Sequence, residues 1–100
     1  MVEIRGNIIV YKVPINGDLG LLSPYLFIER LFDEVVETFP QIKVNKVFVS
    51  RMEAFHQLHC NVPKHYSKAQ ILLISKQIEI IAARLLISLQ EKIHLAKLAG

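Results

Sequence analysis

The sequence predicts an α+β fold in which two helices cover one face of an antiparallel sheet. The expected order is β-α-β-β-α, with a possible extra hairpin at the N-terminus. The last third of the chain has the pattern of one long helix, and a second amphipathic segment begins at a Ser-Pro pair. The remaining apolar segments are rich in β-branched residues. With 100 residues, 52% of them hydrophobic, the chain is expected to form one domain, residues 1–100.

The first predicted strand covers residues 2–13, VEIRGNIIVYKV, and ends at Pro14. Gly6-Asn7 in its middle indicates either a bulge or a two-residue hairpin turn, and we favour one bulged strand. Asn16-Gly17-Asp18 then predicts a turn. We expect the leucines that follow to fold back on the body of the protein.

The first helix is expected to begin with Ser23 as N-cap and Pro24 in its first turn, and to end at Phe39-Pro40. Glu29, Asp33 and Glu37 recur every four residues on what is expected to be a solvated outer face. The expected inward face consists of Ile28, Leu31, Phe32, Val35 and Phe39.

Residues 42–50 form the next predicted strand, and the segment after it has two interpretations. As a helix it would follow directly. As a strand, residues 54–62 alternate, and Arg51-Met52-Glu53 would be a short hairpin connection. We favour the hairpin because the short segment has no helix caps. The strand would then present Ala54, His56, Leu58, Cys60 and Val62 on one face.

The long helix is predicted over residues 67–99, where Ser67 and Gln70 have the spacing of a capping box. A helix of about 30 residues is roughly 45 Å long, whereas a domain of this size is only about 35 Å across. We therefore expect the helix to project from the domain or to lie along a second subunit. Its expected main face consists of Ile71, Ile74, Ile78, Ile81, Ala82, Leu85, Leu89 and Ile93.

A second apolar stripe recurs every seven residues on the opposite side of this helix. It must contact either the other helix of the same chain or the same stripe of a twin subunit, and we favour a homodimer. The charged residues Lys76, Glu79 and Arg84 argue against a membrane span. The predicted dimer interface consists of Leu73, Ile80, Arg84 and Ile87.

Charge is unevenly distributed along the chain. Residues 1–40 carry three basic and six acidic side chains (3 − 6 = −3), and residues 41–100 carry nine and three (9 − 3 = +6). Basic side chains near a sheet edge and a helix start suit a phosphate backbone, and Phe55 and Tyr66 could stack on unpaired bases. The predicted nucleic-acid-binding residues are Lys43, Lys46, Arg51, Lys64, His65 and Lys68.

The order of the elements is similar to that of ribosome-hibernation factors and of the small dimerising subunit of the KEOPS tRNA-modification complex. This resemblance covers the element order and no shared motif. It implies an RNA-associated role, and we expect RNA rather than DNA as the nucleic-acid partner.

Three histidines and the single cysteine fall within ten residues, at His56, His59, Cys60 and His65. Imidazole and thiolate are ligands for zinc or copper, so these residues are the candidate metal ligands. On a helix His56 and Cys60 would share a face with His59 nearby, whereas on the favoured strand His59 points away. The alternative is a buried Cys60 beside partly exposed histidines, with no cofactor.

Three functions follow from these patterns. The favoured one is a non-enzymatic dimeric binding module that contacts nucleic acid, and we identify no catalytic residue. The first alternative is a structural or regulatory subunit that docks on a protein through its long helix. The second is a small metal-dependent enzyme. A single cysteine and the absence of a signal-peptide pattern favour a cytoplasmic location.

Overall fold

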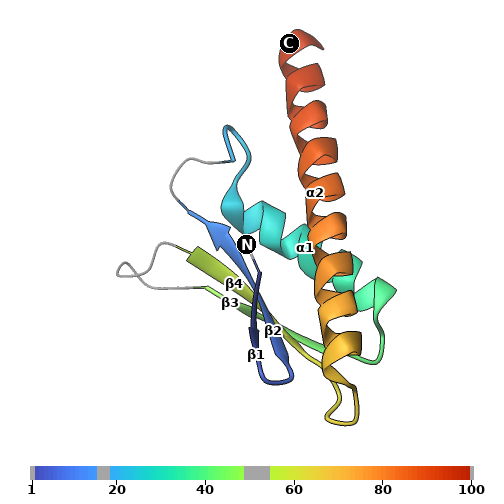
Figure 1. Ribbon diagram of the computed structural model, residues 1–100. Helices are drawn as coiled ribbons and strands as arrows, with labels where there is room; N and C mark the ends of the chain where they lie inside the picture. Colours follow the sequence, from blue (N-terminus) through green and yellow to red (C-terminus); the bar gives the residue numbers. More distant parts are fainter. Residues whose placement is uncertain (1, 16–18, 49–54, 100) are drawn as a thin grey trace.

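The protein has two layers, a four-stranded antiparallel sheet and two helices packed on one of its faces (Figure 1). The computed structural model describes residues 2–15, 19–48 and 55–99. The strands lie in the order β1-β2-β4-β3, so the predicted α+β class is confirmed. The elements are β1 (Val2–Arg5), β2 (Ile8–Pro14), α1 (Pro24–Thr38), β3 (Lys43–Val47), β4 (Phe55–Asn61) and α2 (Lys68–Ala99).

The N-terminal segment is a hairpin, so the prediction of one bulged strand is wrong. β1 and β2 pair in antiparallel register from Val2 opposite Tyr11 to Arg5 opposite Ile8. Gly6 has a φ of 60°, and no described residue other than glycine has a positive φ. A glycine with positive φ followed by a residue with negative φ is the pattern of a type II′ turn, which matches the twist of the flanking strands.

The register of the sheet gives each strand an inner face, under the helices, and an outer face. Ile9, Leu58 and Cys60 point inward and are fully buried. The faces predicted for β4 are therefore confirmed, because successive side chains of a strand point to opposite sides. The outer-face residues are Glu3, Arg5, Ile8, Val10, Lys12, Pro14, Lys43, Asn45, Val47, Phe55, Gln57, His59 and Asn61.

Helix α1 begins where Ser23 Oγ accepts a hydrogen bond from the Leu26 amide at 3.4 Å. It ends at Phe39, whose amide donates to the Val35 carbonyl at 2.8 Å. The predicted inward face is confirmed, with Phe32 only half-buried. Phe27, which was not predicted, is among the largest fully buried side chains.

Helix α2 has the predicted capping box. The backbone N–H of Gln70 donates a hydrogen bond to Ser67 Oγ at 3.1 Å, and the backbone N–H of Ser67 donates one to Gln70 Oε1 at 2.7 Å. All residues of its predicted main face are buried or half-buried. The helix has 32 residues, and the longest dimension of the molecule is 51 Å. Leu89 and Ile93 still pack against the core, so it is the last turns of the helix, after Ile93, that extend past the sheet and α1 (Figure 1).

The connections are only partly described. Leu19 and Leu22 are buried in the core, as predicted for the leucines after the turn, whereas Leu21 is exposed. The turn predicted at Asn16-Gly17-Asp18 and the connection predicted at Arg51-Met52-Glu53 lie outside the described residues.

Candidate nucleic-acid interface

One row of side chains on the outer face of the sheet crosses all four strands and carries a polar or basic side chain on three of them. Arg5 pairs with Ile8, Ile8 with Asn61, and Asn61 with Lys43. The two cations therefore stand at opposite edges of one row, about 14 Å apart for three strand spacings of about 4.8 Å. Neither described helix covers this face, because α1 and α2 both pack on the other side (Figure 1).

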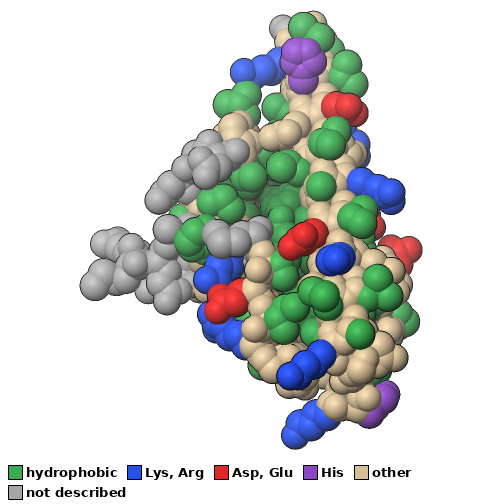
Figure 2. Space-filling model, viewed as in Figure 1, with side chains coloured by type: hydrophobic (Ala, Val, Ile, Leu, Met, Phe, Trp, Pro, Cys, Tyr) green, Lys and Arg blue, Asp and Glu red, His purple; other side chains and the backbone are tan. Residues whose placement is uncertain are grey.

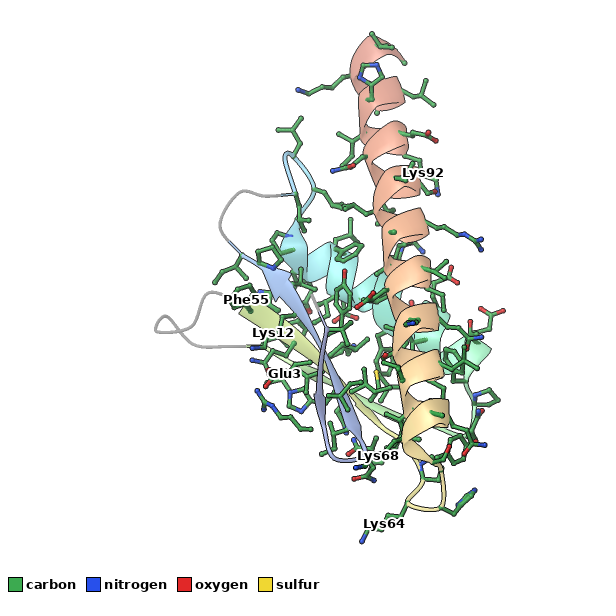
Figure 3. All side chains as sticks on the ribbon, in the orientation of Figure 1. Glu3, Lys12, Phe55, Lys64, Lys68 and Lys92 are labelled. Carbon is green, nitrogen blue, oxygen red and sulfur yellow. The ribbon has the colours of Figure 1, made fainter. Side chains whose placement is uncertain are left out.

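The neighbouring rows of the outer face contain the rings of His59 and Phe55 together with side chains that can form hydrogen bonds. His59 Nε2 and Gln57 Oε1 are hydrogen-bonded at 2.8 Å, and Asn45 lies opposite His59 on β3. Lys12 Nζ stands 5.9 Å from the centre of the Phe55 ring, and Figure 3 shows both residues on the strands. An aromatic ring beside a cation can stack on an unpaired base while the cation contacts its phosphate.

Glu3 is the one acidic side chain that the described residues place on this face. Its carboxylate lies 3.2 Å from Arg5 Nη2 and 3.0 Å from Lys12 Nζ. Hydrogen bonds from Arg5 and then from Lys12 lower the pKa of Glu3 to about 2. The carboxylate orients two cations, and both stay partly exposed to a ligand.

We expect the Glu3 carboxyl to titrate near pH 2 in the folded protein, against an ordinary value of 4.5. Since folding depresses this pKa, its contribution to stability is present above about pH 4.5 and is lost as the pH falls towards 2. NMR titration of the Glu3 side chain measures the midpoint directly. Arg5→Gln, which removes the largest cause of the shift, should move the midpoint back towards 4.5. A wild-type midpoint near 4.5 would contradict the ion network.

A basic end adjoins this face where β4 leads into α2. We call Lys43, Lys64, His65 and Lys68 the basic end of the molecule. The Asn7 side chain donates to the Val62 carbonyl at 2.7 Å, and the Val62 amide donates to the Asn7 carbonyl at 2.9 Å. These bonds tie the β1–β2 turn to the end of β4. Figure 3 places Lys64 and Lys68 together at this end.

Two of the predicted binding residues do not belong to this surface as described. Lys46 lies on the inner face, since it is three residues from the outward Lys43 on the same strand. Its ammonium is 2.8 Å from Glu29 Oε2 and 4.6 Å from the centre of the Phe32 ring. The hydrogen bond that Lys46 donates to the Glu29 carboxylate raises the pKa of Lys46. Lys46 therefore joins β3 to α1, and Arg51 lies outside the described residues.

The acidic side chains of α1 lie away from the outer face and the basic end. Glu29, Asp33, Glu34 and Glu37 all lie on α1, behind the sheet. The sequence has no acidic residue between Glu53 and Glu79, a stretch that carries Lys64, Lys68 and Lys76. Accordingly, the visible part of the lower end in Figure 2 shows lysine and histidine side chains and no acidic one.

The proposed metal ligands do not converge. His56 and Cys60 share the inner face but lie four residues apart with Leu58 between them, about 13 Å along the strand. His59 lies on the outer face, and His65 packs its ring 4.9 Å from that of Tyr66 after β4. Within residues 2–15, 19–48 and 55–99, no group of three His, Cys, Asp or Glu side chains is placed to hold a metal ion.

Cys60 has the environment of a packing residue. Its side chain is fully buried, and burial raises the pKa of the thiol to about 12. At neutral pH the thiolate, which is the nucleophile and the metal ligand, is therefore scarcely populated. His56 packs edge-on against Phe48 with ring centres 5.2 Å apart, in a group that includes Tyr25.

The second apolar stripe of α2 is exposed. The exposed fractions of Leu73, Ile80 and Ile87 are 58%, 50% and 58%. Arg84, which lies among them on the same side of the helix, is also exposed. The sequence predicted this stripe, and α1 does not cover it. In the part of the chain that the structure describes, neither helix has the length and apolar character required to cross a membrane.

Comparison with known proteins adds no relative: no family model matches the chain, and neither a curated protein nor a solved structure matches it significantly. Function must therefore be argued from the fold and the surfaces described above.

Arg5, Lys12 and His59 were not predicted as binding residues. The signal for them was the alternation of β1, β2 and β4, which places each on the face opposite to the core residues Ile9, Leu58 and Cys60. The face of each β1 side chain could be assigned only once the hairpin was known, since a bulge at Gly6-Asn7 would turn the side chains of residues 2–5 to the opposite face.

Proposed function

We propose that this protein is a small dimeric binding module that holds single-stranded RNA across the outer face of its sheet and its basic end. The observation that carries the proposal is the separation of charge. Among the residues that the structure describes, five cations, at positions 5, 12, 43, 64 and 68, surround the outer face and the adjoining end, against the one carboxylate of Glu3. Cations gathered on one surface are the electrostatic footprint of a phosphate-binding site.

The shape and chemistry of the face favour an unpaired strand. A flat sheet gives unpaired bases a platform, and Phe55 and His59 offer rings on which bases can stack. Asn45, Gln57 and Asn61 present amides that can exchange hydrogen bonds with a ribose 2′-hydroxyl, the group that distinguishes RNA from DNA. This role requires binding and no catalytic step.

The exposed side of α2 supports the dimeric part of the proposal and also a second candidate function. A side chain such as Ile87, with 58% of its surface exposed, gains by contact with another apolar surface. A twin copy of the chain is the occupant we favour. The second candidate is a structural or regulatory subunit that docks on a different protein through the same stripe.

Fluorescence anisotropy with a labelled single-stranded RNA tests the RNA-binding proposal. We expect Lys43→Glu/Lys64→Glu/Lys68→Glu to abolish measurable binding, because three attractive contacts become repulsive. For the wild type, the logarithm of the association constant should fall linearly with the logarithm of the salt concentration. Neutralising the three lysines to glutamine should reduce that slope by about 2, at about 0.7 per phosphate contact.

The matched control is Arg30→Glu/Lys92→Glu/Lys97→Glu, which changes the net charge by the same amount on the two helices. It should keep affinity within a few-fold of the wild type. Equal losses in the two triple variants would indicate a non-specific charge effect. A wild-type protein that binds no single-stranded RNA at low salt would refute the proposal.

A further inference from the structure

Helix α2 exposes apolar side chains along one line that runs from Ile80 towards its C-terminal end. Ile80, Ile87, Leu95 and Leu98 are between 50% and 72% exposed. On a helical projection at 100° per residue they lie within about 80° of one another. Hydrophobic side chains are also visible along α2 in Figure 2, where they alternate with charged ones. This line continues the stripe of Leu73, Ile80 and Ile87 into the part of the helix that extends past the body.

Two opposite charges lie within the same line. Arg84 and Glu91 are both exposed and are seven residues apart, so they lie almost directly in line along the helix axis. No salt bridge joins either of them to another described residue. Because about 10.5 Å of helix separates them, they are too far apart to pair with each other within one copy.

We propose that two copies of the chain pair through this line as antiparallel α2 helices, with the two-fold axis passing between Ile87 and Ser88. This arrangement rests on the self-association proposed above. In this arrangement, the residue numbers of two positions that face each other, one from each copy, add up to 175. Arg84 of each copy faces Glu91 of the other, Ile80 faces Leu95, and each pairing occurs twice by symmetry.

Charge complementarity selects this arrangement over the obvious alternatives. A parallel pairing in register would place Arg84 against Arg84 and Glu91 against Glu91. An antiparallel pairing centred on Ile80 would place Lys76 against Arg84. Like charges that face each other across an interface are unfavourable. With the axis between Ile87 and Ser88, each Arg84 instead faces a Glu91 of opposite charge.

The surface shape agrees with this register. A shallow hollow on α2 is lined by Ile87, Gln90, Glu91, His94 and Leu95. The proposed pairing brings Ile80 and Arg84 of the second copy to this hollow. Ile80 of the second copy then contacts Leu95 and Ile87 of the lining. The Arg84 guanidinium of the second copy contacts the Glu91 carboxylate.

The pairing also sets the distance between the two RNA-binding surfaces. Residue 69, in the first turn of α2, lies 18.5 residues from the axis. At 1.5 Å per residue the two first turns are therefore roughly 55 Å apart along the paired helices. The basic ends would point away from each other, so one dimer would hold two separate RNA segments.

Charge reversal tests the register. Arg84→Glu and Glu91→Arg should each raise the dimer dissociation constant about tenfold to a hundredfold, because each places two like-charge pairs in the interface. The double variant Arg84→Glu/Glu91→Arg should restore it to near the wild-type value. Sedimentation equilibrium measures all four proteins, and circular dichroism verifies that each keeps its helices.

A spin label on Ala69→Cys gives an independent distance. The native Cys60 is fully buried, so the introduced thiol reacts selectively. We expect a distance near 55 Å between labels, and a parallel pairing would give a much shorter one.

The outcomes separate the two proposals. A wild-type monomer at high concentration would refute self-association, and with it this arrangement. A dimer in which the single reversals have no effect, or in which the labels lie close together, would refute only the antiparallel register.

Discussion

We expect Ile78→Ala to lower the free energy of unfolding by about 2–5 kcal/mol, the usual cost of truncating a fully buried isoleucine. Ile78 has no exposed surface and lies on the inner face of α2. Its truncation removes apolar contacts and leaves a cavity where the helix packs against the rest of the core. Chemical denaturation followed by circular dichroism measures the change at a protein concentration where light scattering gives the monomer mass.

The matched control is Ile80→Ala, the same substitution two residues further along the same helix. Ile80 is 50% exposed, and alanine has the higher helix propensity. We therefore expect a change of no more than about 0.5 kcal/mol, as for most surface substitutions. Equal losses at both positions would mean that α2 does not pack as described.

We expect Ile80→Glu to convert the proposed dimer into a monomer without disturbing the fold. Ile80 occurs twice in the interface and is 50% exposed before pairing, so burying the rest of each copy contributes about 0.8–1.5 kcal/mol, half the value for a fully exposed side chain. Losing both raises the dissociation constant by about 10- to 100-fold, before the cost of desolvating two carboxylates is added. Light scattering across a concentration series measures the mass, and circular dichroism monitors the helices.

The control for this substitution is Lys92→Glu, which lies about a third of a turn from Ile80 around the helix. It introduces the same side chain outside the stripe and should leave the mass unchanged. An unchanged mass for Ile80→Glu, with a dimeric wild type, would place the interface elsewhere on the molecule.

The helices were the part of the fold that local patterns predicted best. Ser23-Pro24 and the Ser67/Gln70 pair mark the starts of α1 and α2, and the capping bonds have the predicted partners. The apolar spacing of α2 predicted both its buried face and its exposed stripe. Capping and helical periodicity involve residues at most a few positions apart, so the sequence alone contains the information.

The N-terminal hairpin was harder to predict because Gly6-Asn7 is compatible with a bulge and with a turn. The two alternatives differ in whether residues 2–5 pair with residues 8–11, a tertiary choice that propensity does not decide. In the structure β1 gains a partner in β2. This pairing also brings Glu3 within 3.0 Å of Lys12.

The candidate binding surface was predicted in part. Lys43, Lys64, His65 and Lys68 were identified from local charge, and the structure places them at one end of the molecule. Lys46 was included for the same reason, although strand alternation turns it inward to Glu29. Arg5 and Lys12 were missed because they are distant in sequence and reach the surface only through strand pairing.

The sequence by itself thus determined the two helices, their inner faces and the exposed apolar stripe of α2, and it favoured a strand over a helix for residues 54–62 without deciding between them. These depend on short-range periodicity and capping. Only the tertiary structure decided the strand order β1-β2-β4-β3, the side of the sheet to which each cation belongs, and the separation of the histidines and Cys60. Those features depend on pairing between strands far apart in the chain, where a shift of one residue turns every side chain to the opposite face.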